Sequence, residues 1–369
     1  MTPAVADIAL AALRAFTPSQ AAELLARVGS AEEFFRMKSS DVAAVVGRGV
    51  RVADGAVRAK AMAAAQTEAE FIERTGVNCI PWTSPLYPRR LLECCDAPLM
   101  LFQYGTTPLN FPAAISIVGT RHATQYGTDF VADICAQWAS TLVTPPTVVS
   151  GLAYGIDIAA HRGAMAAGLT TVGVVAHGLN TIYPSTHRND AAKMTACGGS
   201  VVTEYLSSDA IHKGNFLARN RIIAGMSDAL LVVESDSRGG ALVTARLAAD
   251  YSRTVLALPG RISDRYSRGS NNLIMRHEAQ LVTSGADIAE VLSWPSREAV
   301  AQEPTLFPTL SADEESIIDA LTAAGSAKLE EIAVRLPHLT TFTLMSVLLD
   351  MECRSLISRA PDGAYSSKI

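Results

Sequence analysis

The sequence has few charged residues and no excess of basic ones. Only 18% of its 369 residues are Asp, Glu, Lys or Arg, while 49% are hydrophobic, which argues against a largely disordered chain. The formal net charge is −5, and a chain that is acidic overall is not by default a nucleic-acid binder. Any binding of nucleic acid must therefore depend on a local basic cluster.

The sequence also lacks metal-binding spacings, a leader and long apolar runs. The six cysteines form no C-x-x-C pair, so we expect no zinc, no other metal and no cofactor. Their scattered positions suit a reducing cytosol. The N-terminus, MTPAVADIAL, has no basic segment before an apolar one, so we expect no signal peptide. Ser227 and Asp228 interrupt the best apolar run, residues 222–233, so we expect no membrane span and a cytoplasmic protein.

The length fits two or three domains. Helical spacing of apolar residues predicts a small helical domain over residues 1–75. Five prolines in residues 76–112 indicate an ordered connector with short strands rather than a domain core. Prolines and mixed charge in residues 293–310 indicate a linker.

Residues 113–292 alternate short apolar runs with helical stretches. Near-continuous Val, Ile and Leu runs separated by helices are typical of a parallel sheet covered on both faces. We therefore predict a doubly wound α/β domain, with the connector as its lead-in over residues 76–112. The expected strands are 114–118, 147–149, 171–175, 200–203, 229–233 and 255–258, and the expected helices are 125–140, 155–167, 186–197, 215–225 and 241–251.

Residues 311–369 predict a second small domain with three helices and a hairpin, which is the layout of a winged helix. Ser311 and Glu314 form a capping box at its start, and Asp362-Gly363 suits the hairpin turn. Many winged helices contact DNA through a basic third helix. Residues 339–352 contain no Lys or Arg, so a protein-contact or regulatory role is favoured for this domain.

In open α/β sheets, ligands bind at the carboxyl ends of the strands. Gly119, Thr120 and Arg121 follow the first expected strand, where a glycine turn, helix N–H groups and a guanidinium suit a phosphate; a plain strand–helix turn is the alternative. The second loop contains Ser150, Gly151 and Gly155 and resembles an anion cradle. It matches neither a Walker A loop, a dinucleotide fingerprint nor a nucleophile elbow.

Asp157 follows that loop and is either a catalytic carboxylate or a side chain that fixes the loop; we favour the second role. A hydrolase triad of Ser150, Asp157 and one of the nearby histidines has no support in the spacing. Those histidines are His161, His177 and His187.

A third segment, residues 212–222, mixes fixed positive charges with an aromatic ring. It contains Lys213, Phe216, Arg219 and Arg221, a mixture suited to phosphates and a splayed base. A solvated basic helix face with Phe216 in the core is equally compatible with the composition. Two further loops, at Gly239-Gly240 and from Pro259 to Asn271, are expected at the same sheet edge.

Five sequence runs, in this order, resemble the DNA processing protein A family, also called DprA or Smf. They are SIVGTRHATQYG, VVSGLAYGIDIAAHRGAMAAG, GLNTIYP, FLARNRIIAGMSDALLVVESDSRGGALVTARLA and VLALPGRISDRYSRGSNNLI, and they cover residues 115–275 densely. The resemblance implies an extended Rossmann-like domain that binds single-stranded DNA and dimerises. It also implies loading of RecA recombinase on incoming DNA in natural transformation, without enzymatic activity. The helical domain would be sterile-alpha-motif-like and the C-terminal one a winged helix.

The resemblance assigns residues of the first three segments to the DNA pocket. A leucine, Leu217, stands where the family pattern Phe-Pro-x-Arg-Asn-Arg has proline, which puts the direction of Phe216 in question. The expected DNA-binding residues are Gly119, Thr120, Arg121, Ser150, Gly151, Gly155, Lys213, Phe216, Arg219, Asn220, Arg221 and Asn271, with Asp157 supporting the loop.

The alternative is an enzyme similar to nucleoside-monophosphate phosphoribohydrolases, which share a Rossmann-like core. Their Pro-Gly-Gly-x-Gly-Thr loop and catalytic Glu are not matched by Pro259-Gly260-Arg261-Ile262. A third possibility is a scaffold with vestigial glycine loops, which predicts no salt-sensitive affinity for DNA.

Overall fold

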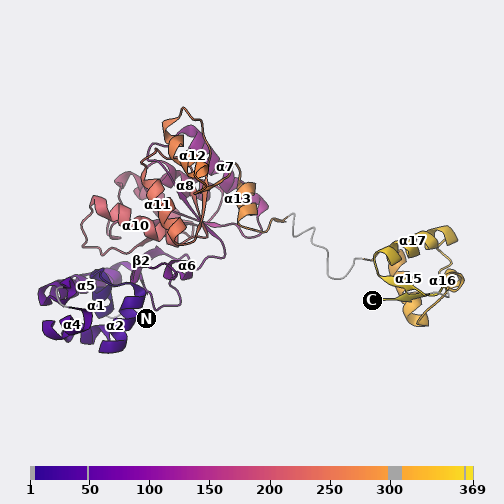
Figure 1. Ribbon diagram of the computed structural model, residues 1–369, viewed down its shortest axis with the longest axis horizontal. Helices are drawn as coiled ribbons and strands as arrows, with labels where there is room; N and C mark the ends of the chain where they lie inside the picture. Colours follow the sequence, from indigo (N-terminus) through magenta and orange to yellow (C-terminus); the bar gives the residue numbers. More distant parts are fainter. Residues whose placement is uncertain (1–4, 48–49, 298–309, 361–362, 369) are drawn as a thin grey trace. The chain divides into compact units, whose positions relative to one another are not determined.

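The computed structural model describes residues 5–47, 50–297, 310–360 and 363–368. They form two compact units that divide near residue 300 (Figure 1). Much of the predicted linker, residues 298–309, lies outside the described residues, as does Asp362 of the predicted hairpin turn.

A nine-stranded sheet is the centre of the first unit's described residues. Its order is β1-β2-β6-β5-β4-β3-β7-β8-β9, with β3 to β9 parallel and β1 and β2 antiparallel at one edge. The predicted mostly parallel sheet is confirmed. The strands are β1 (Asn78–Pro81), β2 (Met100–Gly105), β3 (Ala114–Val118), β4 (Thr147–Ser150), β5 (Thr171–Val174), β6 (Ser200–Thr203), β7 (Ala229–Val232), β8 (Thr254–Ala257) and β9 (Gln280–Leu281).

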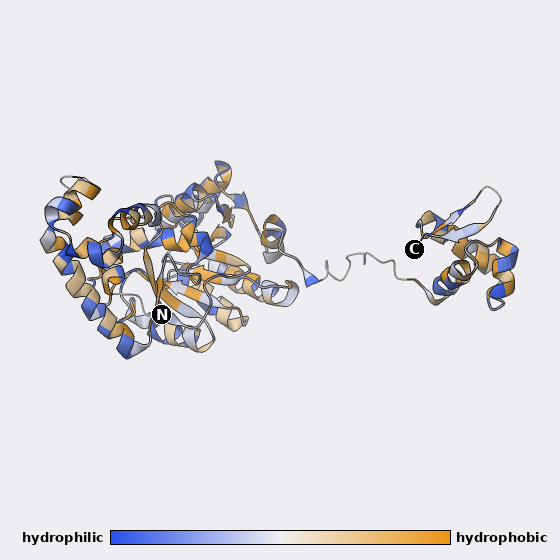
Figure 2. Ribbon diagram, turned by 90° about the horizontal axis from the view of Figure 1, so that it is seen from below, coloured by the Kyte–Doolittle hydropathy of each residue, from blue (hydrophilic) through white to orange (hydrophobic). Residues whose placement is uncertain are grey.

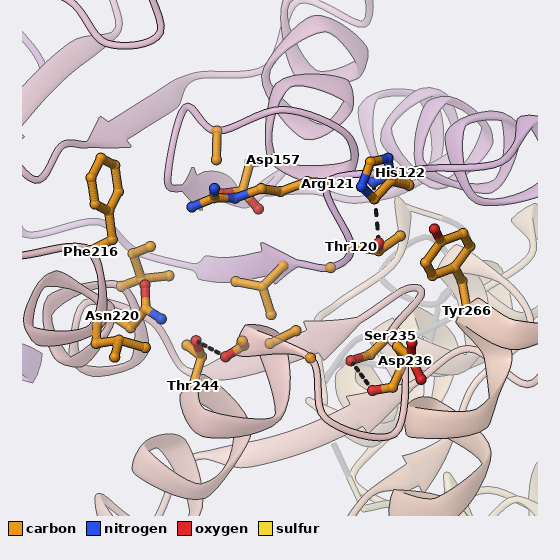
Figure 3. Close-up of a pocket in the computed structure, with 18 of the residues that line it drawn as sticks. Thr120, Arg121, His122, Asp157, Phe216, Asn220, Ser235, Asp236, Thr244 and Tyr266 are labelled. Atoms are coloured by element: carbon orange, nitrogen blue, oxygen red, sulfur yellow. Dashed lines mark hydrogen bonds between the residues drawn. The ribbon is translucent and has the colours of Figure 1, made fainter. Parts of the chain in front are cut away.

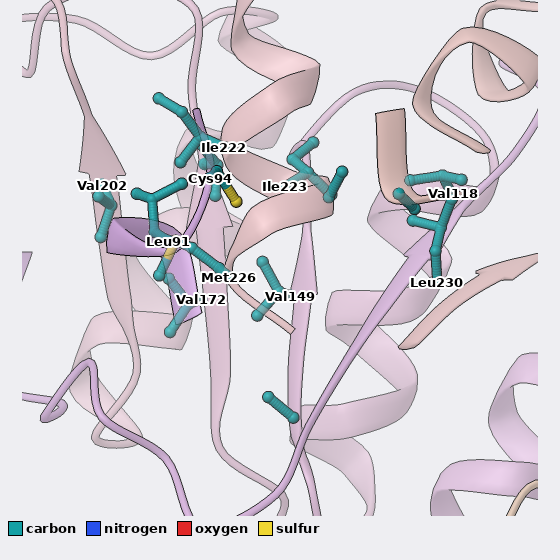
Figure 4. Packing of buried hydrophobic residues seen from close by; sticks show 14 of the residues in the cluster. Leu91, Cys94, Val118, Val149, Val172, Val202, Ile222, Ile223, Met226 and Leu230 are labelled. Carbon is teal, nitrogen blue, oxygen red and sulfur yellow. The ribbon is translucent and has the colours of Figure 1, made fainter. Parts of the chain in front are cut away.

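Helices cover both faces of this sheet because successive strand residues point to opposite sides. On one face, Ile115 and Ile117 of β3 pack with apolar residues of α7 (Gln125–Thr141), α8 (Ile156–Ala166) and α13 (Gly285–Val291). On the other, Ala114 and Val118 pack with α10 (Lys213–Gly225), α11 (Gly240–Asp250) and α12 (Arg268–Met275). Figure 4 shows the second cluster, in which Ile222 and Ile223 of α10 lie over the strands.

The expected lead-in connector, residues 76–112, has the short strands that the sequence indicates, and its apolar residues pack in the core of the domain. It supplies β1, β2 and the short helix α6 (Arg89–Leu92), and Leu91 and Leu101 are buried in the second cluster. Pro81 is tolerated because it ends an edge strand, where a missing N–H breaks no internal ladder bond. The remaining helix of the domain is α9 (Arg188–Ala196).

Among the described residues, the α-helices that precede the sheet are α1 (Val5–Ala12), α2 (Pro18–Val28), α3 (Ala31–Arg36), α4 (Ser39–Val46) and α5 (Gly55–Thr75), in the region where the sequence predicts a small helical domain. Helix α2 begins at a capping box in which Thr17 and Gln20 bond each other's backbone. Ile8 of α1 and Phe71 of α5 pack with Phe102 of β2, so the helices and the sheet share a core. In Figure 2 the strands inside this unit are coloured mainly hydrophobic.

The second unit contains α15 (Ala312–Ala324), α16 (Leu329–Arg335), α17 (Thr341–Cys353) and the antiparallel pair β10 (Ile357–Arg359) and β11 (Tyr365–Ser367). The predicted capping box of Ser311 and Glu314 is present. The order of the elements is the expected one, and the winged-helix interpretation stays a prediction. Across the described residues of both units, no helix combines the length and apolarity needed to cross a membrane.

Candidate functional site

Strands β3 and β7 are neighbours, but the chain leaves β3 for β4 on one side and reaches β7 on the other. This reversal of strand order opens a crevice beyond the carboxyl ends of the strands, the usual ligand position in such sheets. A cavity of about 440 Å³ lies there (Figure 3). Its lining includes Gly119, Thr120, Arg121, His122, Ala153, Asp157, Phe216, Leu217, Arg219, Asn220, Ser235, Asp236, Gly239, Gly240, Thr244, Arg265 and Tyr266.

Backbone hydrogen bonds join the three loops around this cavity. Thr120 donates its N–H to the carbonyl of Glu234 at 2.7 Å and accepts from the N–H of Ile156 at 3.1 Å. Gly155, the N-cap of α8, has φ +77° and ψ −124°, a conformation open essentially to glycine. The loops after β3, β4 and β7 therefore hold one another, and the N-terminus of α8 lies beside Thr120.

One rim of the cavity carries a cation and two aromatic rings. The guanidinium carbon of Arg121 lies 5.7 Å from the ring centre of Phe216. The Tyr183 ring lies 5.6 Å from Phe216 at an interplanar angle of 60°. Arg121 is exposed and Phe216 is half-buried, so both are accessible from solvent. Leu217, at the position where the family has proline, is 56% exposed and continues α10 without a break.

Arg219 and Asp157 form the buried floor beneath this rim. Arg219 is 4% exposed and donates Nη1 to the carbonyl oxygens of Gly151, at 2.7 Å, and Val174. Burial lowers the pKa of Arg219 to about 10, opposed by the nearby charge of Asp157. Burial also raises the pKa of Asp157, opposed by Arg219 and by the N–H groups of Ala153 and Gly151. Both side chains are engaged in holding the loop, as proposed for Asp157, and Arg219 has little surface left for a phosphate.

Six residues assigned to the DNA site from the sequence do not line this cavity: Ser150, Gly151, Gly155, Lys213, Arg221 and Asn271. Ser150 is buried and donates its hydroxyl to Ile117 O at 2.6 Å. Arg221 pairs with Glu204 and donates to Asp96 O at 2.7 Å, because five residues along a helix turn it away from the side of Phe216. Asn271 bonds the backbone N and O of Gly260. Lys213 is exposed at the first residue of α10 but does not line the cavity.

The sequence argument missed the opposite rim. There, the rings of His122 and Tyr266 are stacked with centres 5.9 Å apart and an interplanar angle of 23°. Arg265 Nε lies 2.6 Å from Asp236 Oδ2, and its guanidinium carbon is 5.7 Å from the Tyr266 ring centre. His122 and Asp236 lie in loops, and Arg265 and Tyr266 form a single 3-10 turn, Arg265–Ser267, so none of them belongs to a periodic pattern. The signal available in the sequence was their position after strand ends.

The histidines near the loops serve the fold. His161 Nδ1 lies 2.7 Å from Thr171 Oγ1, His177 Nδ1 lies 2.8 Å from Gly178 O, and His187 Nδ1 lies 2.9 Å from Leu152 O. Within the parts of the chain that are described, no group of His, Cys, Asp and Glu is arranged to hold a metal ion.

The model of the family described as DNA recombination-mediator protein A matches residues 78–293. The chain belongs to this family. Protein Smf of Escherichia coli is 33% identical over 311 residues, covering 79% of this chain and 78% of that protein. The putative DNA processing protein DprA of Mycobacterium tuberculosis is 38% identical over 250 residues, covering 66% of this chain and 63% of that protein. The match therefore spans less than two-thirds of the mycobacterial relative.

Solved structures of the family share the fold. DprA from Streptococcus pneumoniae aligns with a TM-score of 0.64 and 29% identity over 79% of this chain and 98% of that one. DprA from Helicobacter pylori, described for its single-stranded DNA binding mode, aligns with a TM-score of 0.53 and 27% identity over 59% of this chain and 97% of that one. The sheet with preceding helices is thus a DprA fold.

Proposed function

We propose that this chain binds single-stranded DNA in the cavity between the β3 and β7 loops and does no covalent chemistry on it. The observation that carries the proposal is the rim where the exposed guanidinium of Arg121 lies beside the half-buried ring of Phe216. Membership of the DNA recombination-mediator protein A family supports it, as does the DNA binding described for the Helicobacter pylori relative.

Binding combines phosphate contacts with base stacking. Arg121 at the cavity and Lys213 at the start of α10 supply the cations. Phe216 stacks on a base, which contributes roughly 1–3 kcal/mol. Two phosphate contacts on a single strand give a slope of about −1.4 for log K against log salt. Duplex DNA binds less well because its bases are already stacked.

The cavity offers a weaker case for the phosphoribohydrolase alternative. Asp157 is its buried carboxylate, and it already accepts backbone N–H groups and faces Arg219. A general acid or base must reach the reacting group. Because the Asp157 carboxylate is held under the loop in this way, a structural role is favoured over a role as general acid or base.

The test is a titration of a fluorescent oligonucleotide, single-stranded and duplex, across a salt series. Wild type is compared with Arg121→Ala, Phe216→Ala and Arg162→Ala. Arg162 is a matched control because it is exposed on α8 and pairs with Asp190 outside the cavity. We expect salt-sensitive binding of the single strand that Arg121→Ala and Phe216→Ala weaken and Arg162→Ala preserves. Preference for duplex, or equal loss in all three variants, contradicts the proposal, and release of a base from nucleoside monophosphates favours the alternative.

We further propose that the chain acts in the cytoplasm as a homodimer, protects incoming strands and loads RecA on them in natural transformation. This rests on the family to which the chain belongs. A dimer that holds one strand in two pockets gains affinity through effective concentration. RecA assembly on a single strand, followed with wild type and Phe216→Ala, tests it: faster assembly with wild type alone is expected. Sedimentation of the chain gives the oligomeric state, and a monomer that accelerates RecA assembly contradicts the dimer.

A further inference from the structure

The rim opposite Phe216 carries its own aromatic surface. His122 follows β3, whereas Tyr266 lies before α12, and their stacked rings both line the cavity. In Figure 3, Phe216 and Tyr266 stand at opposite sides of the cavity with Arg121 between them. His122 is exposed and Tyr266 is half-buried. The cavity therefore has an aromatic group at each end and a cation in the middle.

The second surface is held firmly in place. The carbonyl of Tyr266 accepts the N–H of Ser235 at 2.5 Å, and Gly269 donates to the carbonyl of Ser235 at 2.7 Å. These bonds tie the Tyr266 segment to the loop after β7. A backbone that is already ordered by such bonds does not have to be ordered when a ligand binds, so that part of the entropy cost is avoided.

The charged residues beside this surface are Arg265 and Asp236, and together they are compatible with binding a polyanion. Arg265 donates Nε–H to the Asp236 carboxylate, which offsets the negative charge that would repel a phosphate. The Arg265 side chain is 71% exposed, so the rest of its guanidinium faces solvent close to the Tyr266 ring. A guanidinium beside an aromatic face pairs a phosphate contact with a base contact.

We propose that the His122–Tyr266 pair is a second base-stacking surface, so that one strand lies across the cavity with a base stacked at each end and Arg121 and Arg265 on its phosphates. This inference rests on the proposed function and adds to it. The two rings already contact each other, so a base stacks on the pair and does not insert between its members. A mononucleotide reaches one surface, whereas a short oligonucleotide reaches both.

The experiment measures the affinity of oligothymidylate for wild type, Tyr266→Leu, His122→Ala and Phe216→Ala, each across a salt series. Leucine keeps bulk at the half-buried position and removes the aromatic face, while His122 is exposed, so its removal spares the fold. Tyr104→Leu is the control, because Tyr104 is 51% exposed on β2 and does not line the cavity. We expect Tyr266→Leu to lower affinity at least about fivefold with an unchanged salt slope, since stacking is not electrostatic. Arg265→Ala lowers the magnitude of that slope by about 0.7.

The outcomes separate the two proposals. If wild type binds and Phe216→Ala weakens binding, but Tyr266→Leu and His122→Ala behave like Tyr104→Leu, the second surface is wrong and the proposed function stands. If wild type fails to bind the oligonucleotide, both are overturned. If an abasic strand of the same length loses as much affinity on Tyr266→Leu as oligothymidylate does, Tyr266 contacts the backbone, and base stacking at that end is overturned.

Discussion

The backbone oxygen of Thr120 occupies the space that a Cβ atom at Gly155 would need. The residues belong to different loops, and this close approach brings the turn after β3 against the N-cap of α8. Gly155 also has φ +77°, which strains any residue with a side chain.

Gly155→Ala is therefore expected to cost about 1–3 kcal/mol of unfolding free energy for the backbone strain alone, with more from the overlap. Single-strand affinity falls with it, because the cavity loops separate. Urea unfolding and DNA titration measure the two effects. Gly168→Ala is the control, since Gly168 has φ +72° with open space around its Cβ position. A loss at Gly155 no larger than at Gly168 would show that the Thr120 contact is unimportant.

A second prediction concerns the pH dependence of stability. Burial lowers the pKa of His161 from 6.5 to about 3, and its Nε2 is buried without a partner among the described residues. As the pH falls from 6.5 towards 3, His161 binds a proton in the unfolded chain but stays neutral in the folded one. The free energy of unfolding therefore decreases by up to roughly 4 kcal/mol. Above pH 6.5 this group has no effect on the pH dependence.

His161→Asn is expected to flatten that acid limb, although it lowers stability at neutral pH by leaving a cavity. Unfolding midpoints between pH 4 and 8 provide the measurement, with exposed His212→Asn as the matched variant. If the acid limb of His161→Asn is as steep as that of wild type, buried His161 is not its source.

Arg221→Ala should weaken the fold and spare the DNA site. Its guanidinium pairs with Glu204, and the two side chains are 17% and 6% exposed, so removal leaves a buried carboxylate unpaired. Loss of one partner in a buried pair costs about 3–5 kcal/mol. Urea unfolding tests the loss, and the double change Arg221→Met/Glu204→Leu is expected to recover much of it. An Arg221→Ala protein of normal stability that fails to bind DNA would instead assign Arg221 to the site.

Two adjacent leucines of α17 should differ sharply in the stability that is lost when each is replaced by alanine. Leu348 is 0% exposed and Leu349 is 63% exposed. Leu348→Ala is expected to cost about 2–5 kcal/mol in the second unit, whereas Leu349→Ala stays within about 0.5 kcal/mol. Amide hydrogen exchange across α15 to α17 reports on that unit within the full chain. Similar effects of both changes would contradict the packing of α17.

Much of the fold followed from apolar runs, because buried parallel strands are nearly continuous in Val, Ile and Leu. The exceptions are at the sheet edges. The bounds of β1 were not predicted because prolines interrupt the apolar pattern there. Strand β9 consists of Gln280 and Leu281, which are both exposed, so no apolar run indicates it. Edge strands bury less surface and carry a weaker pattern.

The site was predicted less completely for a different reason. The basic cluster of α10 was treated as one surface, although helical spacing puts Phe216 and Asn220 on one side and Arg221 on another. That signal was present in the sequence. His122 lies in a loop and Tyr266 in a short 3-10 turn, and the two come together only because of the order of the strands, which local sequence does not encode.

The residues around the cavity should fall into two groups that differ in how well they tolerate substitution. At Gly119, Gly151 and Gly155 a Cβ atom would overlap atoms of neighbouring residues, so almost every substitution there disturbs the fold before it can alter a ligand contact. Arg121, His122 and Arg265 are exposed on the rim and can be exchanged with the fold intact. Substitutions at the rim can therefore change the contacts with a ligand without changing the shape of the crevice.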